Sequence, residues 1–186
     1  MTTAPVTRRV DPDRRDRLVD VTIDVIAEHG VAGTTARRIA AAADVPLGSV
    51  TYHFDGLADL LRAAFTRHAE QMAVRFRAHF ARATDRASML DAAVDFVHDG
   101  HCATPRDWAV AYELYLAALR EPALREVTEA WMHSSRESLG RVLDPELARA
   151  LDGVMEGLTM HAILTTAPPT PEETRTVLAR VLELTP

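Results

Sequence analysis

The sequence predicts an all-α protein, and two observations support this prediction. No stretch shows sustained two-residue alternation of apolar and polar residues, whereas apolar residues recur at three-and-four spacing through most of the chain. Four segments begin with a polar or acidic residue followed by proline, which loses no hydrogen bond at the first position of a helix. These pairs are Thr104-Pro105, Glu121-Pro122, Asp144-Pro145 and Thr170-Pro171.

The same pattern predicts nine helices. The first ends at Gly30, because glycine tolerates the left-handed conformation at a helix C-terminus, and Thr34 or Thr35 caps the second. At the last helix, Thr170 and Glu173 have the spacing of a capping box. The expected ranges are 12–29, 35–42, 46–53, 57–82, 88–101, 105–119, 122–142, 145–165 and 171–184.

Composition excludes several classes of protein. An apolar fraction of 47% in 186 residues argues against disorder. Cys102 is the single cysteine, so no intrachain disulfide forms. The N-terminus lacks an apolar signal core, and no segment is apolar enough to cross a membrane. We therefore expect a cytoplasmic protein without a membrane partner.

Net charge is −6, which at first argues against a nucleic-acid partner. The charge is unevenly distributed, because residues 1–54 hold seven arginines and seven acidic residues, whereas the rest holds fourteen arginines and twenty acidic residues. The first region is therefore neutral. Attraction to phosphates there must come from the local placement of groups.

The most informative stretch is Thr34 to Phe54, TTARRIAAAADVPLGSVTYHF. A short helix around Ile39, a turn at 43–45 and a second short helix from Pro46 have the spacing of a helix-turn-helix. Asp44 occupies the turn position where glycine is usual, and aspartate tolerates left-handed geometry. Helical spacing predicts an inner face of Ile39, Ala40, Val45, Val50 and Phe54, and an outer face of Leu47, Gly48, Thr51 and Tyr52.

Residues 18–61 resemble the TetR family of bacterial transcriptional regulators. The resemblance is carried by the segments LVDVTIDVIAEHG and TTARRIAAAADV, and by Tyr52-His53-Phe54 followed by the helix at 57–82. It lies within about the first third of the chain, and the rest matches in the number and order of helices. It implies an all-α homodimer that binds a palindromic operator in double-stranded DNA and releases it on binding a small ligand. We expect residues 1–56 to bind DNA and residues 57–186 to sense a ligand and dimerise.

The resemblance also implies which residues contact DNA. The family's positions fall on Thr35, Pro46, Leu47, Gly48, Ser49, Thr51, Tyr52 and His53.

Several of these assignments have physical support. Thr35 begins a helix, whose amides suit a phosphate, and Gly48 lets the backbone approach the groove closely. We add Arg37 and Arg38 as phosphate clamps, although an ordinary solvated surface explains them equally well. Tyr52 and His53 could instead cover the core of the three helices.

The sequence departs from the family at Leu57, where lysine is frequent. The arginines of segment 8–17 are candidates to replace the phosphate contact, although they alternate with aspartates as an ordinary surface does.

We expect an apolar ligand pocket among helices 57–142, lined by aromatic side chains with a few polar anchors. We expect the effector to be a small apolar or aromatic molecule, and we expect no cofactor. The alternative is that these side chains form plain core. The expected lining residues are Met72, Phe76, His98, His101, Trp108, Tyr112, Glu113, Tyr115 and Trp131.

Two other kinds of site have weaker support. His98, His101 and Cys102 do not complete a tetrahedral metal site unless the distant His161 joins them, so we expect no metal. Cys102 lacks the surroundings of a catalytic nucleophile, although a redox role is conceivable. We therefore expect no enzyme.

The last two helices are the expected dimer surface, because two such pairs form a four-helix bundle about a two-fold axis. The alternative is that they form core within one chain. We also weigh a regulator whose C-terminal domain only dimerises or binds a protein partner. The expected dimer residues are Ala150, Gly153, Gly157, His161, Val177, Leu178 and Val181.

Overall fold

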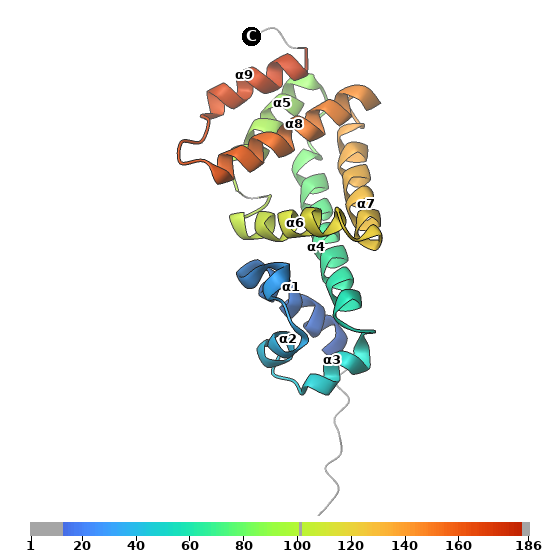
Figure 1. Ribbon diagram of the computed structural model, residues 1–186. Coiled ribbons are helices and arrows are strands. Elements are labelled where there is room, and N and C mark those ends of the chain that lie inside the picture. The colour runs from blue at the N-terminus through green and yellow to red at the C-terminus, as the bar shows by residue number, and fades with distance from the viewer. Residues whose placement is uncertain (1–12, 101, 184–186) are drawn as a thin grey trace, which may run out of the picture. The chain divides into compact units, whose positions relative to one another are not determined.

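The computed structural model describes residues 13–100 and 102–183, and within this part of the chain every regular element is an α-helix (Figure 1). This confirms the predicted all-α fold. None of the described helices is both long and apolar enough to cross a membrane. The helices are α1 (Arg14–Gly33), α2 (Ala36–Ala42), α3 (Leu47–His53), α4 (Leu57–Phe80), α5 (Arg86–His98), α6 (Pro105–Ala118), α7 (Pro122–Leu139), α8 (Pro145–Leu164) and α9 (Pro171–Val181).

Two predicted boundaries are corrected by local hydrogen bonding. Gly30 interrupts α1 with φ of 66°, but residues 31–33 then form a further helical turn, so the helix does not end at Gly30 as predicted. Helix α5 begins at Arg86, two residues before the predicted start, because Asp85 and Ser88 form a capping box. Polar residues of this kind cap a helix through contacts that apolar periodicity does not reveal.

The proline-led helix starts behave as predicted at three of four positions. The side chains of Thr104, Asp144 and Thr170 each accept a hydrogen bond from the backbone amide three residues later. Thr170 and Glu173 form the predicted capping box. Glu121 makes no such side-chain bond.

The chain divides into two compact units between Ala64 and Phe65, within α4. In the first unit, α2 packs against α1 and α3. In the second, α8 packs against α5, α7 and α9, α5 also packs against α9, and α6 packs against α7 (Figure 1).

The turn between α2 and α3 has the predicted left-handed residue, with φ of 51° at Asp44. The amides of Asp44 and Val45 donate to the carbonyls of Ala41 and Ala40, at 3.2 and 3.0 Å. This pairing is the Schellman motif, in which glycine usually occupies the position of Asp44. The backbone of the turn therefore fixes where α3 begins relative to α2.

Replacing Asp44 with valine should destabilise the first unit by about 1–2 kcal/mol, because a β-branched residue strongly disfavours positive φ. Asp44→Gly is the matched control and should stay within about 0.5 kcal/mol of the wild type, since glycine adopts this conformation freely. Thermal unfolding followed by circular dichroism measures both. Equal stability of the two variants would contradict the role assigned to the turn.

Candidate DNA-binding surface and ligand cavity

The two faces predicted for the helix-turn-helix are present. On the inner face Ile39, Ala40, Val50 and Phe54 are buried and Val45 is half-buried. On the outer face Leu47, Gly48, Thr51 and Tyr52 are exposed. The side chain of Tyr52 is 83% exposed, so it does not cover the core of the first unit.

The other predicted DNA-contacting residues lie around this outer face. Thr35 is exposed and caps α2, its hydroxyl accepting from the Arg38 amide at 3.2 Å. Pro46 and Arg37 are exposed, and Ser49 and His53 are half-buried. The rings of Tyr52 and His53 meet edge to face, with centroids 4.9 Å apart. Arg38 is exposed and donates to the Gly33 carbonyl, which holds it near the start of α2.

Arg15 makes a contact that was not predicted from the sequence. Its guanidinium lies over the Phe54 ring, 4.9 Å from the centroid, and places a positive charge beside the end of α3. Arg15 belongs to the arginine-containing segment proposed to compensate for Leu57. Residues 8–12 of that segment lie outside the described residues.

In the second unit, a cavity forms among α4, α5, α6, α7 and α8. Its free volume is about 30 Å³. Five of the residues predicted to line a pocket do so: Met72, Phe76, Trp108, Tyr115 and Trp131.

The remaining predicted pocket residues lie elsewhere. His98 is bonded through Nε2 to the Thr174 hydroxyl at 2.8 Å, so it ties α5 to α9 instead of lining the cavity. Tyr112 stacks on Trp108, with centroids 5.9 Å apart, but it does not itself line the cavity. Glu113 is half-buried and also outside the lining, and His101 is not among the described residues.

The most informative lining residues are two acids on α8 that the sequence analysis did not select, Asp152 and Glu156. They lie four residues apart and therefore on one face of the helix. Arg136 on α7 donates through Nε to Asp152 Oδ2 at 3.2 Å. Burial raises the pKa of Asp152 to about 6, against the opposing effect of Arg136. Burial also raises the pKa of Glu156, although a hydrogen bond from Tyr115 opposes it.

One sequence feature could have revealed these acids. Ala148, Leu151, Met155 and Thr159 form a buried stripe along α8. Asp152 and Glu156 adjoin it, where an amphipathic surface helix normally carries apolar or small residues. The other lining residues not selected are Phe96, Cys102, Met132, Ser135 and Met155.

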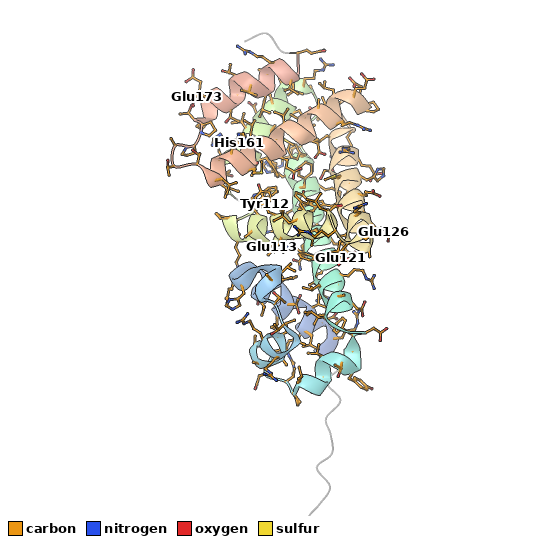
Figure 2. All side chains as sticks on the ribbon, viewed as in Figure 1. Tyr112, Glu113, Glu121, Glu126, His161 and Glu173 are labelled. Atoms are coloured by element: carbon orange, nitrogen blue, oxygen red, sulfur yellow. The ribbon has the colours of Figure 1, made fainter. Side chains whose placement is uncertain are left out.

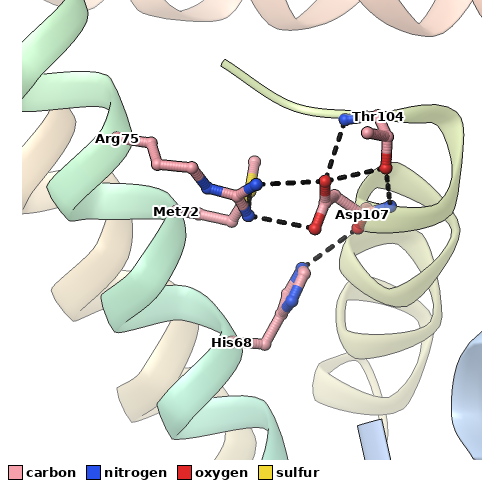
Figure 3. Close-up of polar contacts among 5 residues, drawn as sticks. All are labelled: His68, Met72, Arg75, Thr104 and Asp107. Carbon is pink, nitrogen blue, oxygen red and sulfur yellow. Dashed lines mark hydrogen bonds and ion pairs between the residues drawn. The ribbon is translucent and has the colours of Figure 1, made fainter. Parts of the chain in front are cut away.

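A polar cluster that includes the lining residue Met72 joins α4 to α6 (Figure 3). Arg75 donates two hydrogen bonds to the Asp107 carboxylate, at 3.0 and 3.2 Å, and one to the Met72 sulfur. Thr104 donates to the same carboxylate through its amide and hydroxyl, each at 2.8 Å. Burial would raise the pKa of Asp107, but these bonds outweigh it and lower the pKa to about 2.

His68 extends this cluster toward the cavity. Its Nε2 lies 3.0 Å from the Asp107 carbonyl oxygen, which only accepts, so Nε2 carries the donated proton. Burial lowers the pKa of His68, which keeps the ring neutral near pH 7. The ring also meets Trp131 edge to face, with centroids 6.4 Å apart. The cluster thus holds two residues of the cavity wall, Met72 and Trp131.

The predicted dimer residues are mostly on the outside of α8 and α9. Ala150, Gly153, His161 and Val177 are exposed, and Gly157 and Val181 are half-buried. A methyl group at Gly153 or Gly157 would have no neighbour within 4 Å apart from the adjacent residues and backbone of its own helix. Leu178 is a correction, because its side chain is 0% exposed and belongs to the core of its own protomer.

Neither a metal-binding group of side chains nor a reactive cysteine is apparent among the described residues. No group of three His, Cys, Asp or Glu side chains that could hold a metal gathers within residues 13–100 and 102–183. Burial raises the pKa of the Cys102 thiol to about 11. The thiol is therefore protonated at neutral pH and is a poor nucleophile.

A three-helix unit that exposes the second helix of a helix-turn-helix, joined to a larger helical unit, defines a helix-turn-helix transcriptional regulator. Residues 18–64 match the model for bacterial regulatory proteins of the tetR family, and residues 84–184 match the model for the tetracyclin repressor-like C-terminal domain. The chain belongs to the TetR family. The resemblance noted from the sequence is thereby confirmed.

Comparison with individual proteins agrees with this assignment. The putative transcriptional regulator SCO7518 of Streptomyces coelicolor A3(2) is 41% identical, with a TM-score of 0.84 over 92% of this chain and 99% of that chain. The multidrug binding protein EbrR in complex with ethidium is 37% identical, with a TM-score of 0.76 over 90% of this chain and 98% of that chain. The regulator CymR of Pseudomonas putida is 31% identical over 137 residues, which span 69% of this chain and 64% of CymR.

Proposed function

We propose that this protein is a homodimeric repressor that binds a palindromic DNA operator through the outer face of α3 and the start of α2, and leaves it when a small aromatic molecule enters the cavity of the second unit. The observation that carries the proposal is the division of α3 into two faces. Val50 is buried, whereas Leu47, Thr51 and Tyr52 are exposed although two of them are largely apolar. We place the functional boundary between Gly56 and Leu57.

The proposed contacts divide by chemistry. Leu47 and Thr51 offer apolar groups for thymine methyls in the major groove. The hydroxyl of Tyr52 and the ring of His53 donate to phosphates, and Thr35 brings the N-terminus of α2 to another. Gly48 faces open space, because a methyl group there would have no neighbour within 4 Å apart from the adjacent residues and backbone of its own helix. The DNA backbone therefore has open access at this position.

The proposed effector site is the cavity around Trp108 and Trp131. Support comes from its aromatic lining and from EbrR, whose structures hold imidazole, proflavin, ethidium and malachite green. The ligand need only bind better to the conformer that cannot engage DNA. A coupling of about 1–3 kcal/mol changes operator affinity roughly 5- to 150-fold.

The proposed dimer surface is the outer side of α8 and α9. Exposed apolar side chains there include Met160, Leu164 and Val177, and Gly153 and Gly157 let a second helix approach closely. Dimerisation serves the mechanism, because two recognition helices must be about 34–36 Å apart to enter successive major grooves.

Operator selection from random duplexes, followed by gel-shift titration, tests the proposal. We expect two protomers per palindromic site, by size-exclusion chromatography with light scattering, and release of the operator by malachite green. Ethidium and proflavin are unsuitable for the release assay, because they intercalate into the operator itself. Operator binding that no aromatic ligand alters would favour the alternative, in which the second unit only dimerises or binds a protein partner.

A further inference from the structure

We propose that the ligand of the cavity is an aromatic organic cation and that Glu156 is the side chain that recognises its charge. This inference rests on the proposed function, because it names the chemical class of ligand for the same cavity. It is carried by an imbalance of buried charge, by the aromatic walls, and by an unsatisfied hydroxyl beside them.

The cavity has more negative than positive charge. Asp152 is paired with Arg136 at 3.2 Å, and Glu156 receives a hydrogen bond from the neutral Tyr115 hydroxyl. Arg75 is not part of the lining and is engaged with both oxygens of Asp107. One arginine therefore faces two carboxylates, and ionised Glu156 remains without a full counter-ion.

An uncompensated carboxylate in an apolar cavity is costly. Burial raises the pKa of both Asp152 and Glu156, which reports the energy needed to ionise them there. The same apolar surroundings strengthen attraction to a cation that enters. A cationic ligand thus relieves a cost already present in the ligand-free protein, whereas a neutral ligand leaves it in place.

The walls suit a flat cation. Trp108, Tyr115 and Trp131 line the cavity, and the rings of Tyr115 and Trp131 have centroids 5.8 Å apart. Aromatic faces carry partial negative charge and attract cations, and they also stack on planar groups. The charge and the surface of the cavity therefore favour the same ligand class.

Tyr112 adds an unsatisfied polar group near Glu156, although it does not itself line the cavity. It stacks on Trp108 and lies on α6, on the side that faces α8 (Figure 2). Its hydroxyl oxygen is buried and has no hydrogen-bond partner among the described residues. Burial and the nearby Glu156 raise the pKa of Tyr112 to about 12, so the group is a donor at neutral pH.

The cavity must widen to accept such a molecule. Its free volume of about 30 Å³ holds about two water molecules. Met132 and Met155 are part of its lining, and neither is held by the Arg75–Asp107 cluster. Methionine side chains are unbranched and adapt their shape readily, so they are the groups most easily displaced as a ligand enters.

The test compares ethidium with phenanthridine, its uncharged ring system, in calorimetric titrations of the full chain without DNA at about pH 7.5. We expect the wild type to bind ethidium more tightly than phenanthridine. Glu156→Gln, which keeps an oxygen that accepts from Tyr115, should weaken ethidium binding about tenfold or more and change phenanthridine binding less than about threefold. The matched control is Glu146→Gln, which removes an exposed carboxylate from the same helix and should change neither affinity.

The outcomes separate this inference from the proposed function. Equal loss of both probes in Glu156→Gln, tighter binding of phenanthridine by the wild type, or no binding of ethidium would overturn the assignment of a cationic ligand. Operator binding is measured separately by gel shift and does not depend on the outcome of these titrations. If the wild type binds no operator, the proposed function is wrong instead. A melting temperature for Glu156→Gln at or above that of the wild type would show that the variant is folded.

Acidification provides a second readout, because the quaternary charge of ethidium does not titrate. Ethidium affinity of the wild type should fall below about pH 6, as Asp152, with a pKa of about 6, and Glu156 take up protons. The profile of Glu156→Gln should be flatter. The other groups facing Glu156 are Arg136 on α7 and Tyr112 and Tyr115 on α6, and burial raises the pKa of both phenols, which stay protonated throughout.

Discussion

Tyr52→Ala should weaken operator binding about 100-fold while leaving folding and self-association unchanged. A hydrogen bond to a charged group contributes about 1.5 kcal/mol, and a dimer loses it at both recognition helices, which together amount to about 3 kcal/mol or roughly 100-fold in affinity. The side chain is 83% exposed, so its removal costs the fold little. Fluorescence anisotropy with a labelled operator at fixed salt measures the loss.

Tyr52→Phe identifies the group responsible. If the hydroxyl binds a phosphate, the phenylalanine variant should lose nearly as much affinity as the alanine variant, with an unchanged salt dependence because tyrosine is uncharged. Leu119→Ala removes an exposed apolar side chain from the second unit and serves as the control. Wild-type affinity in Tyr52→Ala would contradict the assignment of the recognition surface.

The helix-turn-helix was predictable because its determinants are local. The whole turn lies within the short stretch from Ala43 to Val50. Asp44 has a positive φ, and aspartate is one of the few residues that tolerate this conformation. The burial of Val50 and the exposure of Tyr52 then follow from helical periodicity alone. Missed details, such as Arg15 over Phe54, join residues far apart in sequence.

The cavity of the second unit was only partly predictable, for the opposite reason. Phe76, Trp108, Tyr115 and Trp131 were selected correctly as lining, because large apolar side chains at helical spacing must be buried somewhere, whereas Tyr112 was selected wrongly. The acids of α8 were missed because one helix serves two surfaces: Gly153 and His161 face outward, while Asp152 and Glu156 face the cavity. Which side of α8 meets α7 depends on packing between helices, and the partner of Asp152, Arg136, lies sixteen residues away.

Asp107→Ala should lower the free energy of unfolding by about 3 kcal/mol. It removes the two hydrogen bonds that the carboxylate accepts from Thr104, a loss of about 1 kcal/mol, and leaves the partly buried Arg75 without its carboxylate, a loss of about 2 kcal/mol. For a chain of this size the melting temperature should fall by roughly 6–12 °C. Differential scanning calorimetry measures the change.

The contribution of Asp107 depends on pH in a defined direction. Its pKa is about 2 in the folded protein, below the ordinary value of 3.8, so the folded state holds fewer protons than the unfolded state between these values. The stabilisation is therefore complete above about pH 5 and is lost as the pH falls from about 4 toward 2. The difference between wild type and Asp107→Ala should narrow over the same range, and a difference that grows on acidification would contradict this account.

The ion pair between Asp91 and Arg175 is the matched control, because it has a shorter distance but a more exposed setting. Its nitrogen and oxygen are 2.7 Å apart, and the Asp91 side chain is 64% exposed, against 21% for Asp107. Solvent screens an exposed pair, so a double-mutant cycle should give a coupling below about 0.5 kcal/mol for Asp91 and Arg175. For Asp107 and Arg75 the coupling should reach about 1–2 kcal/mol, because two parallel hydrogen bonds are made away from water. A larger coupling at the exposed pair would show that distance outweighs burial here.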